Sequence, residues 1–186
     1  MKKKLLLHSC CAPCTCGVVD QLEDYDITLL FYNPNIDTLE EYNRRLSAYT
    51  EMLKRFRDDF GYDIKLIAIP YNPSEFLEKI KGFERANEGG ARCSICIELR
   101  LDFTSKYAKD FGYDLFASTL SVSPHKNNTL INQIGESLSE KYNIEYLPSD
   151  FKKNNGFLNS VNRSKSYGIY RQNYCGCEFA KSHLKK

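Results

Sequence analysis

Residues 4–14 read KLLLHSCCAPC, and this stretch joins a short apolar run to a loop rich in thiols. A run of this length is typical of a strand buried on both faces of a parallel sheet. Similar runs recur along the chain at residues 27–32, 64–69, 114–118 and 144–147. The sequence therefore predicts five buried strands.

Helical patterns separate these runs. The clearest begins at Asp37, where Glu40 three residues later completes a plausible capping pair, and ends at Gly61. Its apolar face would comprise Leu39, Tyr42, Leu46, Tyr49, Leu53, Phe56 and Phe60. Two more helices are expected at about residues 93–111 and 127–142. This alternation predicts one α/β domain with a mostly parallel, doubly wound, Rossmann-like sheet and helices on both faces.

The position of the thiol loop indicates where a site should lie. Open parallel sheets bind ligands beyond the carboxyl ends of their strands, and residues 8–14 follow the first strand there. A nucleotide-binding protein would have a glycine-rich phosphate loop at this point. The nearest glycine is Gly17, so a triphosphate site is not expected.

The eight cysteines fall into three groups, at residues 10–16, 93–96 and 175–177. The first seven residues are too short for a secretory or membrane-spanning segment, so we expect a cytoplasmic protein whose thiols stay reduced. With 42% hydrophobic residues, its 186 residues should form a core without disulfides. Core thiols and structural zinc are possible readings, but this many thiolates favours iron and sulfide.

Charge is distributed unevenly along the chain. Residues 1–150 carry 18 Lys and Arg against 23 Asp and Glu, whereas residues 151–186 carry 8 against 1. The C-terminal segment also holds six aromatic rings, a composition that suits RNA phosphates and unpaired bases. We expect residues 151–186 to close the cysteine site. The candidate phosphate contacts are Lys152, Lys153, Arg163, Lys165 and Arg171.

Several motifs together resemble one family over nearly the whole chain. They are HSCCAPC at 8–14, YNPNI at 32–36, RCSIC at 92–96, TLSVSP at 119–124, DF at 150–151 and YRQNYCGC at 170–177. The chain resembles the QueH-type epoxyqueuosine reductases. It departs from their pattern at Asp37-Thr38, where His-Pro is expected, and at Cys16, which looks like an additional cysteine.

The resemblance implies an activity and its partners. It implies that epoxyqueuosine at the wobble position of tRNA is reduced to queuosine, with an iron-sulfur cluster and a nearby second iron. It also implies a fold related to nucleotide hydrolases but without their phosphate loop. Removing an epoxide oxygen as water takes two electrons and two protons, so an external one-electron donor is expected.

The cysteine motifs and their neighbours supply candidate metal ligands and proton donors. We assign Cys10, Cys11, Cys93 and Cys96 to a 4Fe-4S cluster. Cys175 and Cys177 would hold the second iron or complete the cluster's ligand set, Cys14 would join either centre, and Cys16 would bind no metal. The candidate proton donors are Asp150, Tyr174 and His8.

Two other readings keep the same cysteines. In the first, zinc holds them together and the protein is a non-catalytic RNA-binding module. In the second, the protein is a cluster-dependent tRNA thiolation enzyme, which would need ATP. The missing phosphate loop argues against this second reading.

Overall fold

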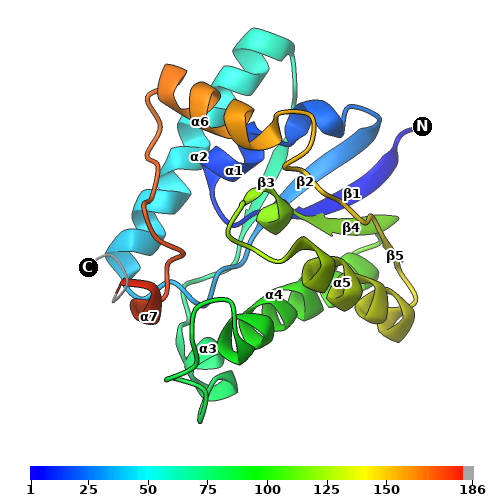
Figure 1. Ribbon diagram of the computed structural model, residues 1–186. Helices are drawn as coiled ribbons and strands as arrows, with labels where there is room; N and C mark the ends of the chain where they lie inside the picture. The colour runs from blue at the N-terminus through cyan, green and yellow to red at the C-terminus, as the bar shows by residue number, and fades with distance from the viewer. Residues whose placement is uncertain (182–186) are drawn as a thin grey trace.

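A computed structural model describes residues 1–181, and its centre is a five-stranded sheet in which every strand is parallel (Figure 1). The strands are β1 (Lys3–His8), β2 (Tyr25–Phe31), β3 (Lys65–Ala68), β4 (Leu115–Ser118) and β5 (Glu145–Tyr146). They lie in the order β3-β2-β1-β4-β5. All five expected strands are present, and the predicted single α/β architecture is confirmed.

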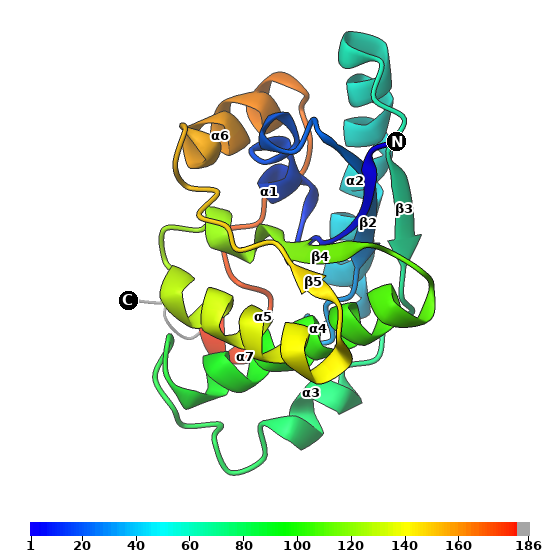
Figure 2. The same cartoon turned by 90° about the vertical axis from the view of Figure 1, so that its right-hand side faces the viewer.

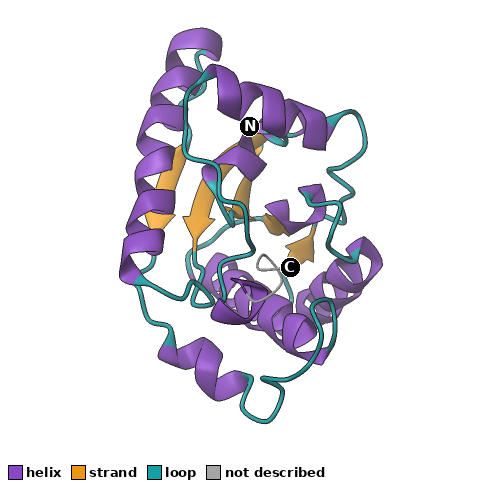
Figure 3. Ribbon diagram, turned by 60° about the vertical axis from the view of Figure 1, so that its left-hand side comes forward, coloured by secondary structure: helices purple, strands orange, loops and turns teal. Residues whose placement is uncertain are grey.

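Helices cover both faces of this sheet (Figures 2 and 3). They are α1 (Ala12–Cys16), α2 (Leu39–Phe60), α3 (Ser74–Lys79), α4 (Ala91–Asp110), α5 (Asn128–Tyr142), α6 (Gly156–Ser166) and α7 (Glu178–Lys181), with two 3-10 turns, η1 (Val19–Gln21) and η2 (Thr119–Val122). Alternate residues of β1 point to opposite layers: Leu5 and Leu7 pack with α1 and α2, whereas Leu6 packs with α4 and α5.

Helix α2 begins later than predicted. Thr38, not Asp37, caps it, because the Thr38 hydroxyl accepts the backbone N–H of Glu41 at 3.2 Å. Its end is as expected, at Gly61 in the left-handed conformation with φ 70°. The apolar face is buried only in its middle, and Leu39 and Phe60 at its two ends are exposed.

The order of the strands creates a switch point. After β1 the chain proceeds outward to β2 and β3, then crosses back to add β4 on the other side of β1. The carboxyl ends of β1 and β4 therefore lie side by side with their following loops diverging, which is where open α/β sheets bind ligands. The loop at residues 9–11 and the turn η2 both start there.

The C-terminal segment crosses this end of the sheet. From α6 the chain runs alongside α2 to α7 (Figure 1). Helix α6 packs closely on α1, since a Cβ atom at Gly17 would lie only 2.1 Å from the carbonyl oxygen of Gly156. Near α7, a third small core joins α3 and α4 to the end of the chain and includes Cys96 and Cys177.

Candidate metal centre

Three cysteines lie together where β1 ends. The ligand atoms of Cys10, Cys11 and Cys14 all lie within 4.8 Å of one another. The Cys11 sulfur caps α1 by accepting the backbone N–H of Cys14 at 3.4 Å. The buried hydroxyl of Ser9 fixes the start of the loop to α2, because it hydrogen-bonds to the Tyr49 hydroxyl at 2.5 Å. The sulfurs are thus gathered in one place by local structure and a rigid support.

Four cysteines line a second, smaller cavity of about 60 Å³. Cys93 and Cys96 come from the first turns of α4, and Cys175 and Cys177 come from the C-terminal segment. Gly176 between the latter two has φ 120°, a conformation that favours glycine. This cavity therefore joins segments that are far apart in sequence, since Cys96 and Cys175 are 79 positions apart, and it forms where α4 meets the C-terminal segment.

A larger cavity of about 620 Å³ adjoins the small one. Its lining includes Cys10 and Cys14 from the N-terminal trio, and Cys175 from the four cysteines of the small cavity. Six residues line both cavities: Glu88, Gly89, Arg100, His125, Lys126 and Cys175. The two cysteine groups thus open toward one space beyond the sheet.

Three cations surround these thiols: Arg45 and Arg100 are buried, and Lys126 is partly exposed. The Lys126 ammonium lies 3.5 Å from the Cys175 sulfur and, with Arg100 and Arg45, lowers the pKa of that thiol. The Arg100 side chain is buried and donates from Nε to the carbonyl of Cys96 at 3.1 Å. Because buried anions need compensating charge, these cations fit a site built to hold thiolates.

Hydrogen bonds divide the three N-terminal thiols. Hydrogen bonds from the thiols of Cys11 and Cys14 lower the pKa of Cys10. Burial raises the pKa of Cys11 to about 12, and hydrogen bonding to Cys10 raises that of Cys14. Hydrogen bonding thus favours the thiolate at Cys10 over those at Cys11 and Cys14. A soft, thiophilic metal would stabilise all three as thiolates.

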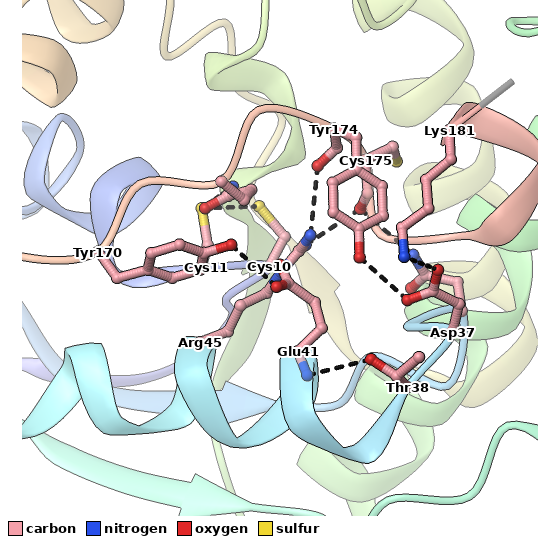
Figure 4. Close-up of polar contacts among 12 residues, drawn as sticks. Cys10, Cys11, Asp37, Thr38, Glu41, Arg45, Tyr170, Tyr174, Cys175 and Lys181 are labelled. Carbon is pink, nitrogen blue, oxygen red and sulfur yellow. Dashed lines mark hydrogen bonds and ion pairs between the residues drawn. The ribbon is translucent and has the colours of Figure 1, made fainter. Parts of the chain in front are cut away.

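Residues at and just before the start of α2 hold the segment that carries Cys175 (Figure 4). Arg45 donates to the carbonyl oxygens of Cys175 at 3.1 Å and Tyr174 at 3.2 Å. The Asp37 carboxylate accepts the Tyr174 hydroxyl at 2.9 Å and pairs with Lys181 at 2.7 Å. Asp37, at which this chain departs from the expected motif, is therefore an anchor for the segment that carries Cys175.

Of the three predicted proton donors, Tyr174 lines the larger cavity. Burial and its hydrogen bond to Asp37 raise the pKa of Tyr174 to about 12. His8 is fully buried beneath the loop. Its Nε2 lies 3.1 Å from the Tyr32 carbonyl, which can only accept, so Nδ1 accepts from the Ser118 hydroxyl at 2.9 Å. Burial lowers the pKa of His8 to about 4, so this ring is neutral.

Asp150 lies outside both cavities described above. It sits in the turn before α6, where its carboxylate is 3.9 Å from Lys152 and 3.8 Å from Lys153. The geometry therefore gives Asp150 and His8 no direct access to the cavity.

The five predicted phosphate contacts differ in their surroundings. Arg163 is held by Asp20 at 2.7 Å and by the carbonyl of Cys16 at 2.9 Å, so it braces α6 against α1. Arg171 is exposed and lines the larger cavity. Lys153 and Lys165 are exposed, and Lys152 is partly exposed.

The sequence reasoning missed several residues of the site. Gln172 donates to the Cys11 sulfur at 2.9 Å, and Thr119 accepts the N–H of Cys10 at 3.2 Å. Arg45, Arg100 and Lys126 were missed as well. Thr119 and Gln172 lie inside motifs that were noted, so their position was a usable signal. Arg45 and Arg100 gave none, because each reads as an ordinary polar residue of a helix.

Comparison with known proteins supports the interpretation of these residues. A family model described as "Epoxyqueuosine reductase QueH" matches residues 5–183. The chain belongs to the epoxyqueuosine reductase QueH family. The predicted resemblance is confirmed.

Named QueH proteins match nearly the whole chain. The protein from Staphylococcus epidermidis is 44% identical over 182 residues, covering 96% of this chain and 76% of the relative. The one from Streptococcus pyogenes serotype M1 is 41% identical over 181 residues, covering 97% and 71%. The QueH protein of Thermotoga maritima is 35% identical over 179 residues, covering 95% and 89%.

A solved structure supports the fold. It is described as a predicted subunit of tRNA methyltransferase from Methanocaldococcus jannaschii, and it matches with a TM-score of 0.52 at 14% identity. The match covers 89% of this chain and 74% of that one. Within residues 1–181, no helix combines the length and apolar character needed to cross a bilayer.

Proposed function

We propose that this QueH-family protein reduces the epoxide of epoxyqueuosine in tRNA to the alkene of queuosine, in the cytoplasm, with metal held by its cysteines. Family membership supports the reaction. The observation that carries the proposal is that six cysteines line two adjoining cavities beyond the sheet. The sulfur of a seventh, Cys11, lies within 4.8 Å of the sulfurs of Cys10 and Cys14.

The chemistry of the donor set fits iron and sulfide. Cys93, Cys96, Cys175 and Cys177 supply the four thiolates that a 4Fe-4S cluster requires. Cys10, Cys11 and Cys14 would hold a second iron. This partition differs from that expected from the sequence, which grouped Cys10 and Cys11 with Cys93 and Cys96. It rests on the small cavity that four cysteines line together and on the mutual proximity of the other three sulfurs. Cys16 is buried among core residues and stays outside both sets.

The reaction sets clear requirements on the residues. Both C–O bonds of the epoxide break, a C=C bond forms, and the oxygen leaves as water after taking up two protons and two electrons. An external one-electron donor supplies the electrons in succession. When bound, iron and sulfide would transfer these electrons singly and provide Lewis acidity.

The protein's own side chains prepare the space for this reaction. Lys126 and Arg100 stabilise negative charge on the cysteines. Tyr174 is the proposed proton donor that lines the larger cavity. Its single hydroxyl proton is donated to Asp37, so this hydrogen bond must break before the proton can pass to the departing oxygen. A phenol can protonate an alkoxide, which is a far stronger base than phenolate.

The function is tested by an anaerobic assay. Iron-reconstituted protein is incubated with epoxyqueuosine-containing tRNA and a chemical reductant, and the nucleosides are then analysed by mass spectrometry. We expect a product lighter by one oxygen. Absence of queuosine with protein that holds its full iron and sulfide would contradict the proposal. A colourless zinc protein without acid-labile sulfide would instead favour the RNA-binding module.

A further inference from the structure

The aromatic rings of the C-terminal segment are nearly all engaged within the protein. Phe151 is buried in the core, and the Tyr170 hydroxyl donates to Glu41 at 2.8 Å. Tyr174 donates to Asp37, as described above. The Tyr167 ring packs edge-on against Phe56 at 6.2 Å, and the Phe179 ring lies 4.7 Å from the Arg92 guanidinium in the third core. These five rings contribute to folding.

Phe157 is different, because it lines the larger cavity and its residue is 39% exposed. It lies in the first turn of α6, on the wall that faces the same space as Cys10, Cys14 and Cys175. The exposed part of the ring lines the cavity and is not covered by the protein. The ring is therefore available for stacking against a ligand in the cavity.

Arg171 extends this wall. Its guanidinium carbon is 5.7 Å from the centre of the Phe157 ring, and Nη1 donates to the buried hydroxyl of Ser160 at 3.0 Å. Within residues 1–181, Arg171 forms no ion pair with a carboxylate. A serine hydroxyl thus positions the guanidinium without neutralising it.

Polar groups complete the same part of the cavity. Gln172 follows Arg171 and points its Nε2 at the Cys11 sulfur. Its Oε1 is buried and has no hydrogen-bond partner among the described residues. A buried acceptor without a donor is costly, so a donor supplied by a ligand would stabilise it.

These features match the requirements of an unstacked nucleobase. RNA bases outside a helix are bound by stacking on aromatic rings and on arginine planes, with hydrogen bonds to their edges. A volume of about 620 Å³ lies within the range of small-molecule sites. We propose that Phe157 and Arg171 form the stacking wall for the wobble base of the tRNA substrate and turn it toward the cysteines. This inference rests on the proposed function and adds the residues that select the base.

The test is a binding cycle between protein and RNA variants. Two anticodon stem–loop RNAs are compared, one with its wobble base and one with an abasic wobble position, and binding to iron-reconstituted protein is measured by fluorescence anisotropy. We expect wild type to bind the base-bearing RNA roughly 5- to 150-fold more tightly, the range that one stacked base contributes. Phe157→Ala should bind both RNAs almost equally, and Phe157→Tyr should restore most of the preference.

Leu158→Ala is the matched control. Leu158 is the neighbouring residue on α6, it is 53% exposed, and it does not line the cavity. It should keep the wild-type preference. Because both side chains are exposed, both variants should match wild type in thermal unfolding and iron content.

Arg171→Lys separates stacking from charge. Lysine keeps the positive charge but lacks the planar group, so the preference for the base should fall while the salt dependence of binding is retained. The proposal is overturned if wild type binds the two RNAs equally, or if Phe157→Ala weakens both to the same extent. Binding and turnover are separate readouts: base preference without epoxide reduction refutes the function, and reduction without base preference refutes the wall.

Discussion

Nη1 of Arg45 lies 3.1 Å from the carbonyl oxygen of Cys175, and this contact joins α2 to the segment that supplies the last two cysteines. The Arg45 side chain is only 3% exposed and pairs with Glu41 at 2.7 Å. One guanidinium thus serves both the packing of α2 and the position of a candidate metal ligand.

Replacing Arg45 by Met should lower the free energy of unfolding by about 3–5 kcal/mol, because the buried Glu41 carboxylate loses its cation. Urea unfolding measures this cost. The double variant Glu41→Met with Arg45→Met should recover much of the stability but still lose iron to a chelator faster than wild type, since the carbonyls of Tyr174 and Cys175 lose the guanidinium. Wild-type iron retention in the double variant would show that Arg45 does not position this segment.

Substitutions in the two sets of cysteines should remove different metal centres. Cys93→Ser and Cys96→Ser are expected to abolish cluster absorbance and sulfide, whereas Cys14→Ser should reduce total iron and leave that absorbance in place. Iron, sulfide and visible spectra of the reconstituted variants test this partition. Cys16→Ala is the control and should match wild type, because Cys16 packs in the core. Full iron and sulfide in Cys93→Ser and Cys96→Ser would rule out the assignment.

His8 should make the protein less stable in mild acid. Its pKa is lowered to about 4 in the fold, against an ordinary value near 6.5, so the unfolded chain binds the proton more readily. Stability is therefore complete above about pH 6.5 and is lost as the pH falls toward 4, by at most about 3 kcal/mol. Glutamine can make both of the ring's hydrogen bonds without titrating. The difference in unfolding free energy between wild type and His8→Gln should therefore change with pH over this range, and a constant difference would contradict a buried neutral ring.

The basic segment should contribute to tRNA affinity through charge. Substituting Lys152, Lys153 and Lys165 by alanine should weaken binding and flatten its dependence on salt, since each phosphate contact adds to the slope. Binding isotherms at several salt concentrations measure this slope. Lys106→Ala, an exposed lysine on α4, is the control and should leave the slope unchanged. An unaltered slope in the triple variant would exclude this surface as the docking site.

Arg163 should behave differently from those lysines. Its ion pair with Asp20 and its bond to the Cys16 carbonyl tie α6 to α1. Arg163→Ala is therefore expected to lower the thermal unfolding midpoint by a few degrees, with a smaller effect on the salt dependence of tRNA binding. Unchanged unfolding together with a reduced salt slope would reverse this assignment and restore Arg163 as a phosphate contact.

The parts of the fold that the sequence predicted are those with local signals. The central strand residues 5–7 are wholly apolar because both faces of the sheet are covered, and this makes β1 recognisable by itself. Gly61 predicted the end of α2, because glycine readily adopts the left-handed conformation that ends many helices. The start of that helix was misplaced because Asp37 and Thr38 are both good capping residues, and Asp37 instead bonds to residues far away in sequence.

The candidate site was predictable in its residue types but not in its grouping. The cysteine motifs stand out in the sequence, whereas their partners depend on how α4 and the C-terminal segment meet. The role proposed for Phe157 could not be predicted from the sequence either. The segment holds six aromatic residues, and only their packing in the fold shows which one lines the cavity. Long-range contacts of this kind leave no periodic signal.

The C-terminal origin of Cys175 and Cys177 has a consequence for biosynthesis. During translation, β1 and its three cysteines emerge early, but the cavity of about 60 Å³ lacks one wall until residue 177 has left the ribosome. Complete metal loading must therefore follow synthesis of the whole sheet, and a nascent chain stalled before this point would expose Cys93 and Cys96 to any competing metal.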